Sequence, residues 1–146
     1  MARQTVSQTQ AIVEFVSRVA GQRLSIGLDV HKKSYDIAIL GNDGTVWTSR
    51  GPANTEWIVR LIRDYGLDIG IIAYEAGPTG FSAARAFLEA GFSCVVVAPA
   101  QTLRPAALGA KTDRLDCVRL AELAAHGLVH PVAIPTAQEE AKRDIM

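Results

Sequence analysis

The sequence predicts one α/β domain in which helices cover a mixed β-sheet. Near its start, short apolar segments separated by turn residues are typical of three consecutive antiparallel strands. Further along, segments with apolar residues at helical spacing alternate with nearly continuous apolar runs, the pattern of helices that connect buried strands. At 146 residues, the chain is long enough for one such domain with a substantial core.

Residues 24–40 contain the first two predicted strands and the first candidate functional residue. Two apolar segments flank the basic turn Lys32-Lys33-Ser34, which indicates a hairpin with an exposed turn. Asp29 lies inside the first of these segments. A carboxylate in a central strand is costly unless something compensates its charge.

The other elements follow from turn signals and apolar spacing. The turn at 41–44 reads Gly-Asn-Asp-Gly, which tolerates the positive φ of a tight hairpin. Asn54 is expected to cap a helix that Gly66 ends. Residues 99–112 have no clear period and are expected to form a loop or a broken helix. Beyond the hairpin, the chain is predicted to form strands at 45–49, 69–74 and 93–98, and helices at 5–20, 55–65, 81–90, 113–126 and from 137 onward.

The element order βββ-α-β-α-β-α limits the topology. Three antiparallel strands followed by alternating helices and strands form a mixed sheet with covered faces. The right-handed crossover rule places the fourth strand beside the first. The predicted fold is therefore ribonuclease-H-like, with a five-stranded sheet of order 3-2-1-4-5 flanked by helices.

Composition excludes several classes of protein. Fifteen Lys and Arg balance fifteen Asp and Glu, so bulk charge indicates neither a polycationic nucleic-acid binder nor an acidic tail. No apolar run approaches the ~20 residues of a membrane span, and the start lacks the pattern of a secretion signal, so we expect a cytoplasmic protein. Cys94 and Cys117 do not form a disulfide framework, and Cys117 has no second Cys or His at the spacing of a zinc site.

Four carboxylates meet in the predicted topology. Asp29, late in the first strand, lies near Glu75, at the end of the neighbouring fourth strand. Asp113 and Asp116 are three apart at the start of the predicted helix 113–126, so they face the same way. Carboxylates at contact distance cannot all stay ionised without cations. Two Mg²⁺ ions roughly 3.5–4 Å apart would neutralise them and support in-line displacement at a phosphodiester, with Mn²⁺ as a substitute.

Each acid also has a structural interpretation. Asp29 can be a turn residue that ends its strand. Glu75 can serve the positive N-terminal end of the helix that follows it. Asp113 and Asp116 fit the capping preferences of a helix start without any metal. The convergence of all four on neighbouring elements favours the metal site.

Basic residues surround this predicted site. Positive charge around an acidic metal centre suits a phosphate backbone, whereas solvated side chains on turns are the alternative. His31 follows Asp29 by two positions and would point the same way if the strand continues. The candidate nucleic-acid-binding residues are His31, Lys32, Lys33, Arg104, Lys111 and Arg114.

The acids lie in three short blocks: Gly27-Leu28-Asp29-Val30-His31-Lys32, Tyr74-Glu75-Ala76-Gly77 and Lys111-Thr112-Asp113-Arg114-Leu115-Asp116. Together these blocks resemble the motifs of the DEDD transposases, insertion-sequence recombinases related to the pilin-gene invertase. The resemblance implies a RuvC-like catalytic domain that binds Mg²⁺ through the four acids. It also implies DNA strand cleavage and exchange, a structured guide RNA as partner, and assembly as a homo-oligomer.

The resemblance divides the chain into three parts. Residues 1–22 are expected to be an N-terminal helical extension, 23–130 the RuvC-like domain, and 131–146 the start of a linker or helix toward a C-terminal transposase domain. Family members usually carry in that second domain a serine that attacks DNA. Because this chain stops at Met146, we expect that nucleophile to be missing and the fragment alone to be inactive.

Three other functions remain open. A nuclease similar to Holliday-junction resolvases would share the fold and the metal. Sugar-kinase and actin-like ATPases also begin with an apolar strand that carries an aspartate, but they need a glycine-rich phosphate hairpin where this chain has His31-Lys32-Lys33-Ser34. A non-catalytic module for nucleic-acid binding or oligomerisation would use the acids only to cap helices.

Overall fold

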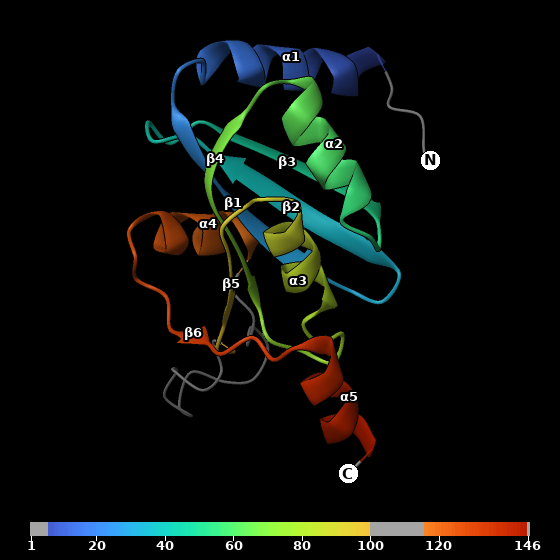
Figure 1. Cartoon of the computed structure of the whole chain (residues 1–146). Helices are drawn as coiled ribbons and strands as arrows, with labels where there is room; N and C mark the ends of the chain where they lie inside the picture. Colours follow the sequence, from blue (N-terminus) through green and yellow to red (C-terminus); the bar gives the residue numbers. More distant parts are fainter. Residues whose placement is uncertain (1–5, 100–115, 146) are drawn as a thin grey trace, which may run out of the picture.

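One mixed sheet organises the structure, a computed structural model that describes residues 6–99 and 116–145 (Figure 1). Its strand order is β3-β2-β1-β4-β5-β6. The strands are β1 (Arg23–Val30), β2 (Ser34–Leu40), β3 (Val46–Pro52), β4 (Asp68–Glu75), β5 (Cys94–Val97) and β6 (Pro131–Val132). The helices are α1 (Val6–Arg18), α2 (Glu56–Asp64), α3 (Ser82–Glu89), α4 (Cys117–Ala125) and α5 (Ala137–Ile145).

The strand order confirms the predicted ribonuclease-H-like arrangement. β1, β2 and β3 form consecutive antiparallel pairs, whereas β4 lies parallel to β1 and β5 parallel to β4. The structure adds a sixth strand, because β6 pairs antiparallel with β5 through Val96 and Val132. A strand of two residues carries no periodicity, so the sequence pattern could not reveal it.

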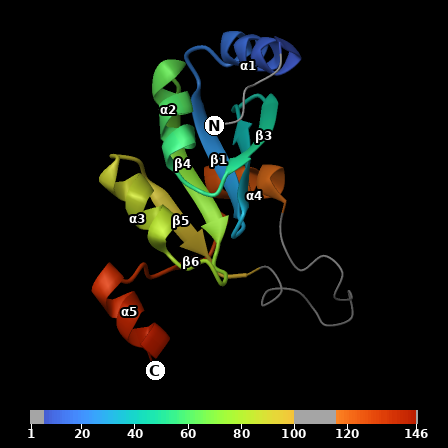
Figure 2. The same ribbon diagram turned by 90° about the vertical axis from the view of Figure 1, so that its right-hand side faces the viewer.

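Helices cover both faces of the sheet. Figure 2 shows α2 and α3 on one side and α4 on the other. The larger core lies on the α2 and α3 side and includes the buried Ile26, Tyr74 and Phe87. α1 contributes to the same core through Ile12, Phe15 and Val19, and the rings of Phe15 and Trp47 lie 6.5 Å apart. α1 is therefore packed onto the domain. No helix among the described residues has the length and apolar character to cross a membrane.

The second, smaller core lies between the sheet and α4. Ala73 and Val97 from the sheet meet Leu120 and Ala124 from the helix. α4 crosses β1 so closely that a Cβ atom on Gly27 would lie 1.9 Å from the backbone oxygen of Cys117. Only glycine fits there, because any side chain would push α4 away from the sheet.

Two helix starts differ from their predicted positions. The helix predicted at 113–126 corresponds to α4, which begins at Cys117, and Asp116 is its N-cap with extended backbone angles. The Oδ1 atom of Asp116 accepts the Arg119 backbone N–H at 2.8 Å, which satisfies one of the donors that every helix start leaves open. The prediction that Asp116 lies within this helix is therefore wrong. Asp113 lies outside the described residues, so its shared face with Asp116 stays a prediction. At α2 the cap position is Thr55, one residue later than expected, while the side chain of Asn54 accepts the Glu56 backbone N–H at 3.1 Å.

α5 is fastened to the beginning of α3. Glu140 accepts the Phe81 backbone N–H at 3.1 Å and pairs with the guanidinium of Arg85. Arg85 also donates to the Pro135 carbonyl at 2.9 Å. A carboxylate at this position stabilises the positive end of α3, which has no side-chain cap of its own.

Candidate functional site

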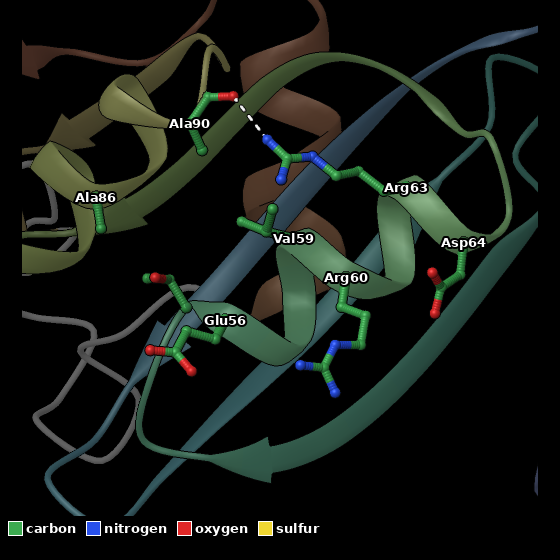
Figure 3. A pocket seen from close by; sticks show the side chains of 8 residues that line it. Glu56, Val59, Arg60, Arg63, Asp64, Ala86 and Ala90 are labelled. Carbon is green, nitrogen blue, oxygen red and sulfur yellow. Dashed lines mark hydrogen bonds between the residues drawn. The ribbon is translucent and has the colours of Figure 1, made fainter.

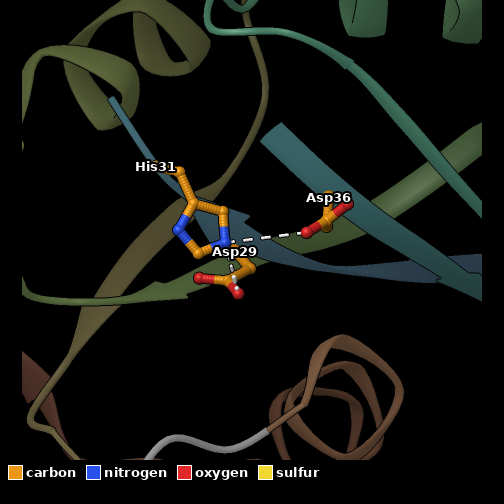
Figure 4. A group of neighbouring side chains, drawn as sticks. All are labelled: Asp29, His31 and Asp36. Carbon is orange, nitrogen blue, oxygen red and sulfur yellow. Dashed lines mark ion pairs between the residues drawn. The ribbon is translucent and has the colours of Figure 1, made fainter. Parts of the chain in front are cut away.

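Two aspartates face each other across the β1–β2 hairpin. Asp29 on β1 pairs in register with Asp36 on β2, so both side chains leave the same face of the sheet. The imidazole of His31 lies between them, with Nε2 at 2.9 Å from Asp29 Oδ2 and 3.6 Å from Asp36 Oδ2 (Figure 4). Like charges directly opposite each other destabilise a sheet, so a cation bound between these two carboxylates would stabilise it.

Glu75 extends this pair into a row. It is the last residue of β4, and the parallel register that joins Leu28 to Tyr74 places it beside Asp29. Ala73, two positions earlier, packs on the α4 side, so Glu75 faces the same side. Glu75 is buried, with 6% of its surface exposed. The structure thus brings Asp29 and Glu75, which were predicted together, onto adjacent strands and one face.

The start of α4 lies over the same part of the sheet. The Cys117 thiol donates to the Asp36 carbonyl oxygen at 3.4 Å, and the nearby carboxylates of Asp29, Asp36 and Asp116 help burial to raise the pKa of this thiol to about 12. Asp116 and Asp36 line one pocket of about 500 Å³ between α4 and the strands β2 and β3. The exposed N-cap acid therefore lies beside the row of sheet acids.

Arg50 on β3 lies at the other end of this row, next to Asp36. It pairs in register with Asp36, and its fork donates to both carboxylate oxygens, from Nε at 2.6 Å and from Nη2 at 3.1 Å. This hydrogen bonding holds the pKa of Asp36 below its ordinary value, with a smaller contribution from His31. The row of side chains across four neighbouring strands is therefore Arg50, Asp36, Asp29 and Glu75.

Removing the guanidinium should raise the pKa of Asp36. We expect the carboxyl carbon of Asp36 in Arg50→Gln to titrate at higher pH than in the wild-type chain, measured by carbon-detected NMR. Because Asp36 has a lowered pKa when folded, its pairing stabilises the fold above the unfolded pKa of about 3.9 and is lost as pH falls through the folded pKa. The free energy of unfolding of Arg50→Gln should therefore lack the part that falls with pH because Asp36 takes up a proton. An unchanged titration would mean that Arg50 does not hold the carboxylate in solution.

The donor set fits a hard divalent cation. One ligand atom each from Asp29, His31 and Asp36 lies within 4.8 Å of the other two. Carboxylate oxygens are the ligands that Mg²⁺ prefers, and Mn²⁺ also accepts an imidazole nitrogen. A cation among Asp29, Asp36 and Glu75 would offset their mutual repulsion, which an imidazole alone offsets only when it is protonated.

Four of the predicted site residues lie outside the residues that the structure describes: Arg104, Lys111, Asp113 and Arg114. Lys32 and Lys33 are exposed in the turn between β1 and β2, directly after His31. Sequence reasoning missed Asp36 and Arg50. The signal for Asp36 was available, since Asp29 and Asp36 are equally far from the centre of the predicted hairpin turn.

A second pocket lies on the other face of the sheet. It has a volume of about 480 Å³ between α2 and α3, and Figure 3 shows Arg63 reaching across it to the Ala90 carbonyl, a contact of 3.4 Å. Arg60 and Glu56 also line it. This pocket is separated from the acids by the sheet, so the row on the α4 side is the better candidate for chemistry.

Comparison with known proteins identifies the relatives of the chain. The IS110-type DEDD transposase family model, described as a transposase, matches residues 26–144. A protein of Sinorhizobium fredii that carries the name transposase y4qE is 33% identical over 126 residues, which cover 83% of this chain and 32% of that protein. The transposase for insertion sequence element IS1533 of Leptospira borgpetersenii is 29% identical over 130 residues, covering 86% of this chain and 38% of its own. The chain thus spans roughly a third of the length of these curated relatives.

Proposed function

Because the chain belongs to the IS110-type family of DEDD transposases, we propose that residues 23–130 form a RuvC-like catalytic domain for DNA strand cleavage and exchange. In this proposal Mg²⁺ is bound by Asp29, Glu75, Asp113 and Asp116. Mn²⁺ would serve as a substitute, since it accepts the same oxygen ligands.

One observation carries the proposal: Asp29 and Glu75, 46 positions apart in the chain, occupy adjacent strands on one face, beneath the end of α4 that carries Asp116. A helix start alone explains Asp116, because its Oδ1 atom accepts a backbone N–H. The helix start does not explain the two further acids on the sheet below it, Asp29 and Glu75. Carboxylates that gather in this way are the usual ligands of Mg²⁺ in nucleotidyl chemistry.

The residues of the chain have separable roles in this proposal. Bound divalent ions supply Lewis acidity and a deprotonated water or hydroxyl at neutral pH. Asp29 and Glu75 hold that charge from the rigid sheet, where neighbouring strands fix their spacing. Asp116 keeps Oδ1 on the α4 cap, so Oδ2 is the atom that would bind the ion. Cys117 packs behind them and helps to fix α4 against β2.

DNA is the proposed substrate, with contacts made through the backbone. Lys32 and Lys33 are exposed at the end of the hairpin that carries Asp29, where they can contact phosphates. His31, Arg104, Lys111 and Arg114 complete the proposed contact set. The family resemblance further supports a structured guide RNA and a homo-oligomer, and shape recognition of that RNA would reduce the need for direct base readout.

Divalent cations should stabilise the chain against heat. A ligand at about 100 times its dissociation constant adds about 2.7 kcal/mol, which corresponds to a rise of roughly 5–10 °C in Tm for a domain of this size. We expect this rise in millimolar Mg²⁺ or Mn²⁺, measured by differential scanning fluorimetry, and its reversal by EDTA. Sodium chloride of equal ionic strength is the control. A melting temperature that neither cation changes would contradict the metal site and favour a non-catalytic module, in which the acids only cap helices.

A further inference from the structure

We propose that Arg50, held in place by Asp36, binds a phosphodiester of the DNA strand beside the metal centre. The inference rests on the proposed function, because it assigns a DNA-binding residue to that same site. It starts from the row across the sheet, in which Arg50, Asp36 and Asp29 follow one another on β3, β2 and β1.

Arg50 is exposed and yet ordered. Its side chain is 70% exposed, but two hydrogen bonds, at 2.6 and 3.1 Å, fix the guanidinium against Asp36. An exposed arginine normally samples many rotamers and loses that freedom when it binds a ligand. Here the fork is already oriented before any ligand arrives, so less entropy is lost on binding.

The guanidinium retains donors for a second acceptor. Arginine carries five N–H donors in one plane, and the bonds to Asp36 use one on Nε and one on Nη2. The other donors lie at the far side of the fork, where a phosphate oxygen can accept them. Asp36 thus acts as a positioning residue that presents the guanidinium to the solvent side of the row.

The surroundings of Arg50 suit a phosphate backbone. Arg50 lines the pocket of about 500 Å³ between β3 and α4, together with Thr48 and Ser49. Thr48 is two positions from Arg50 on β3, so the two side chains share a face. A hydroxyl and a guanidinium on one face are common phosphate contacts. The pocket is open to solvent at this edge, as a passing strand requires.

The position relative to the acids is also suitable. Arg50 lies two strands from Asp29, or about 10 Å at the usual strand spacing. That is about three steps of a DNA strand at a 3.4 Å rise. Arg50 can therefore contact the strand being cleaved within a few nucleotides of the ion-bound phosphate.

One of the two carboxylates that line the pocket opposes an anion, so phosphate binding there should depend on metal. Asp36 is neutralised by Arg50 itself, whereas Asp116 faces the same pocket and carries its own negative charge. A divalent ion on Asp116 would remove that repulsion. We therefore expect the contribution of Arg50 to be larger in Mg²⁺ than in EDTA.

The test is DNA binding by the 146-residue chain and its variants, measured by fluorescence anisotropy of a labelled duplex in Mg²⁺. Arg50→Ala is expected to weaken binding about 10-fold, and Arg50→Lys to remain weak because an ammonium cannot replace the fork. Asp36→Ala should also weaken binding, by about 3- to 10-fold, although it removes a negative charge. Arg60→Ala, an exposed arginine on α2 across the sheet, is the matched control and should stay within 2-fold of wild type. Circular dichroism confirms that each variant is folded.

The outcomes separate this inference from the proposed function. Wild-type binding in Mg²⁺ with unchanged affinity in Arg50→Ala overturns the inference alone. Tighter binding by Asp36→Ala overturns the positioning role, since simple repulsion would then explain Asp36. A loss that appears with RNA of the same sequence but not with DNA overturns the assignment to DNA. Absence of wild-type binding to DNA, with or without Mg²⁺, contradicts the proposed function and this inference together.

Discussion

Replacing Gly27 by alanine is expected to lower the free energy of unfolding by about 3 kcal/mol, a severe case of overpacking. The added Cβ would lie 1.9 Å from the Cys117 oxygen and 2.8 Å from the Ala121 nitrogen. Both atoms belong to the α4 backbone and have no rotamer to change, so the whole helix must move. In thermal unfolding the loss corresponds to a fall in Tm of roughly 6–12 °C.

Gly77→Ala is the matched control for this variant. A Cβ at Gly77 meets no atom within 4 Å, so its substitution should change Tm by no more than about 2 °C. Since α4 also carries Asp116, Gly27→Ala should lose much of the Mg²⁺-dependent rise in Tm as well. Equal melting temperatures for the two variants would show that α4 does not lie against β1 as described.

Asp29→Ala is expected to abolish the rise in Tm caused by Mg²⁺ or Mn²⁺. Asp29 lies between Asp36 and Glu75 in the row, so its removal takes away the central ligand of the proposed centre. Without metal, the variant should melt at or above the wild-type temperature, because repulsion among the three carboxylates is reduced. Both quantities come from one set of melting curves recorded with and without the cations.

Asp64→Ala provides the corresponding control. Asp64 is an exposed acid at the end of α2, on the opposite face, and its variant should keep the full cation response. A wild-type-like response in Asp29→Ala would place the bound ion elsewhere. A loss of the response in both variants would indicate a general effect of charge, with no site at the row.

The strand order could be predicted because three simple rules act together. The hairpins are marked by short turns, β4 is largely apolar between Asp68 and Glu75, β5 is apolar throughout, and right-handed crossovers leave one arrangement. The proximity of Asp29 and Glu75 follows from that order. β6 could not be predicted, since its two residues join the sheet only through the partner strand β5.

The details of the site depended on which polar residues pair across the strands and on helix caps, and neither is visible in the spacing of apolar residues alone. Asp36 and Arg50 are ordinary polar residues in sequence, and their importance comes from being paired across strands. The predicted start of α4 is too early because the helical spacing of apolar residues extends back to residue 113. In the structure the Asp116 carboxylate accepts a backbone N–H as the N-cap, so the helix begins at the next residue, Cys117.

The row of side chains makes the site a reporter of correct strand pairing during folding. Successive residues of a strand point to opposite faces, so sliding β1 by one residue against β2 would turn Asp29 toward the apolar core and Leu28 toward α4. Such a misaligned sheet would bury the charge of Asp29 and would at the same time separate it from Asp36 and Glu75 on the neighbouring strands. A cation that needs all of them would bind only the aligned sheet and would thereby draw misfolded molecules toward the native pairing.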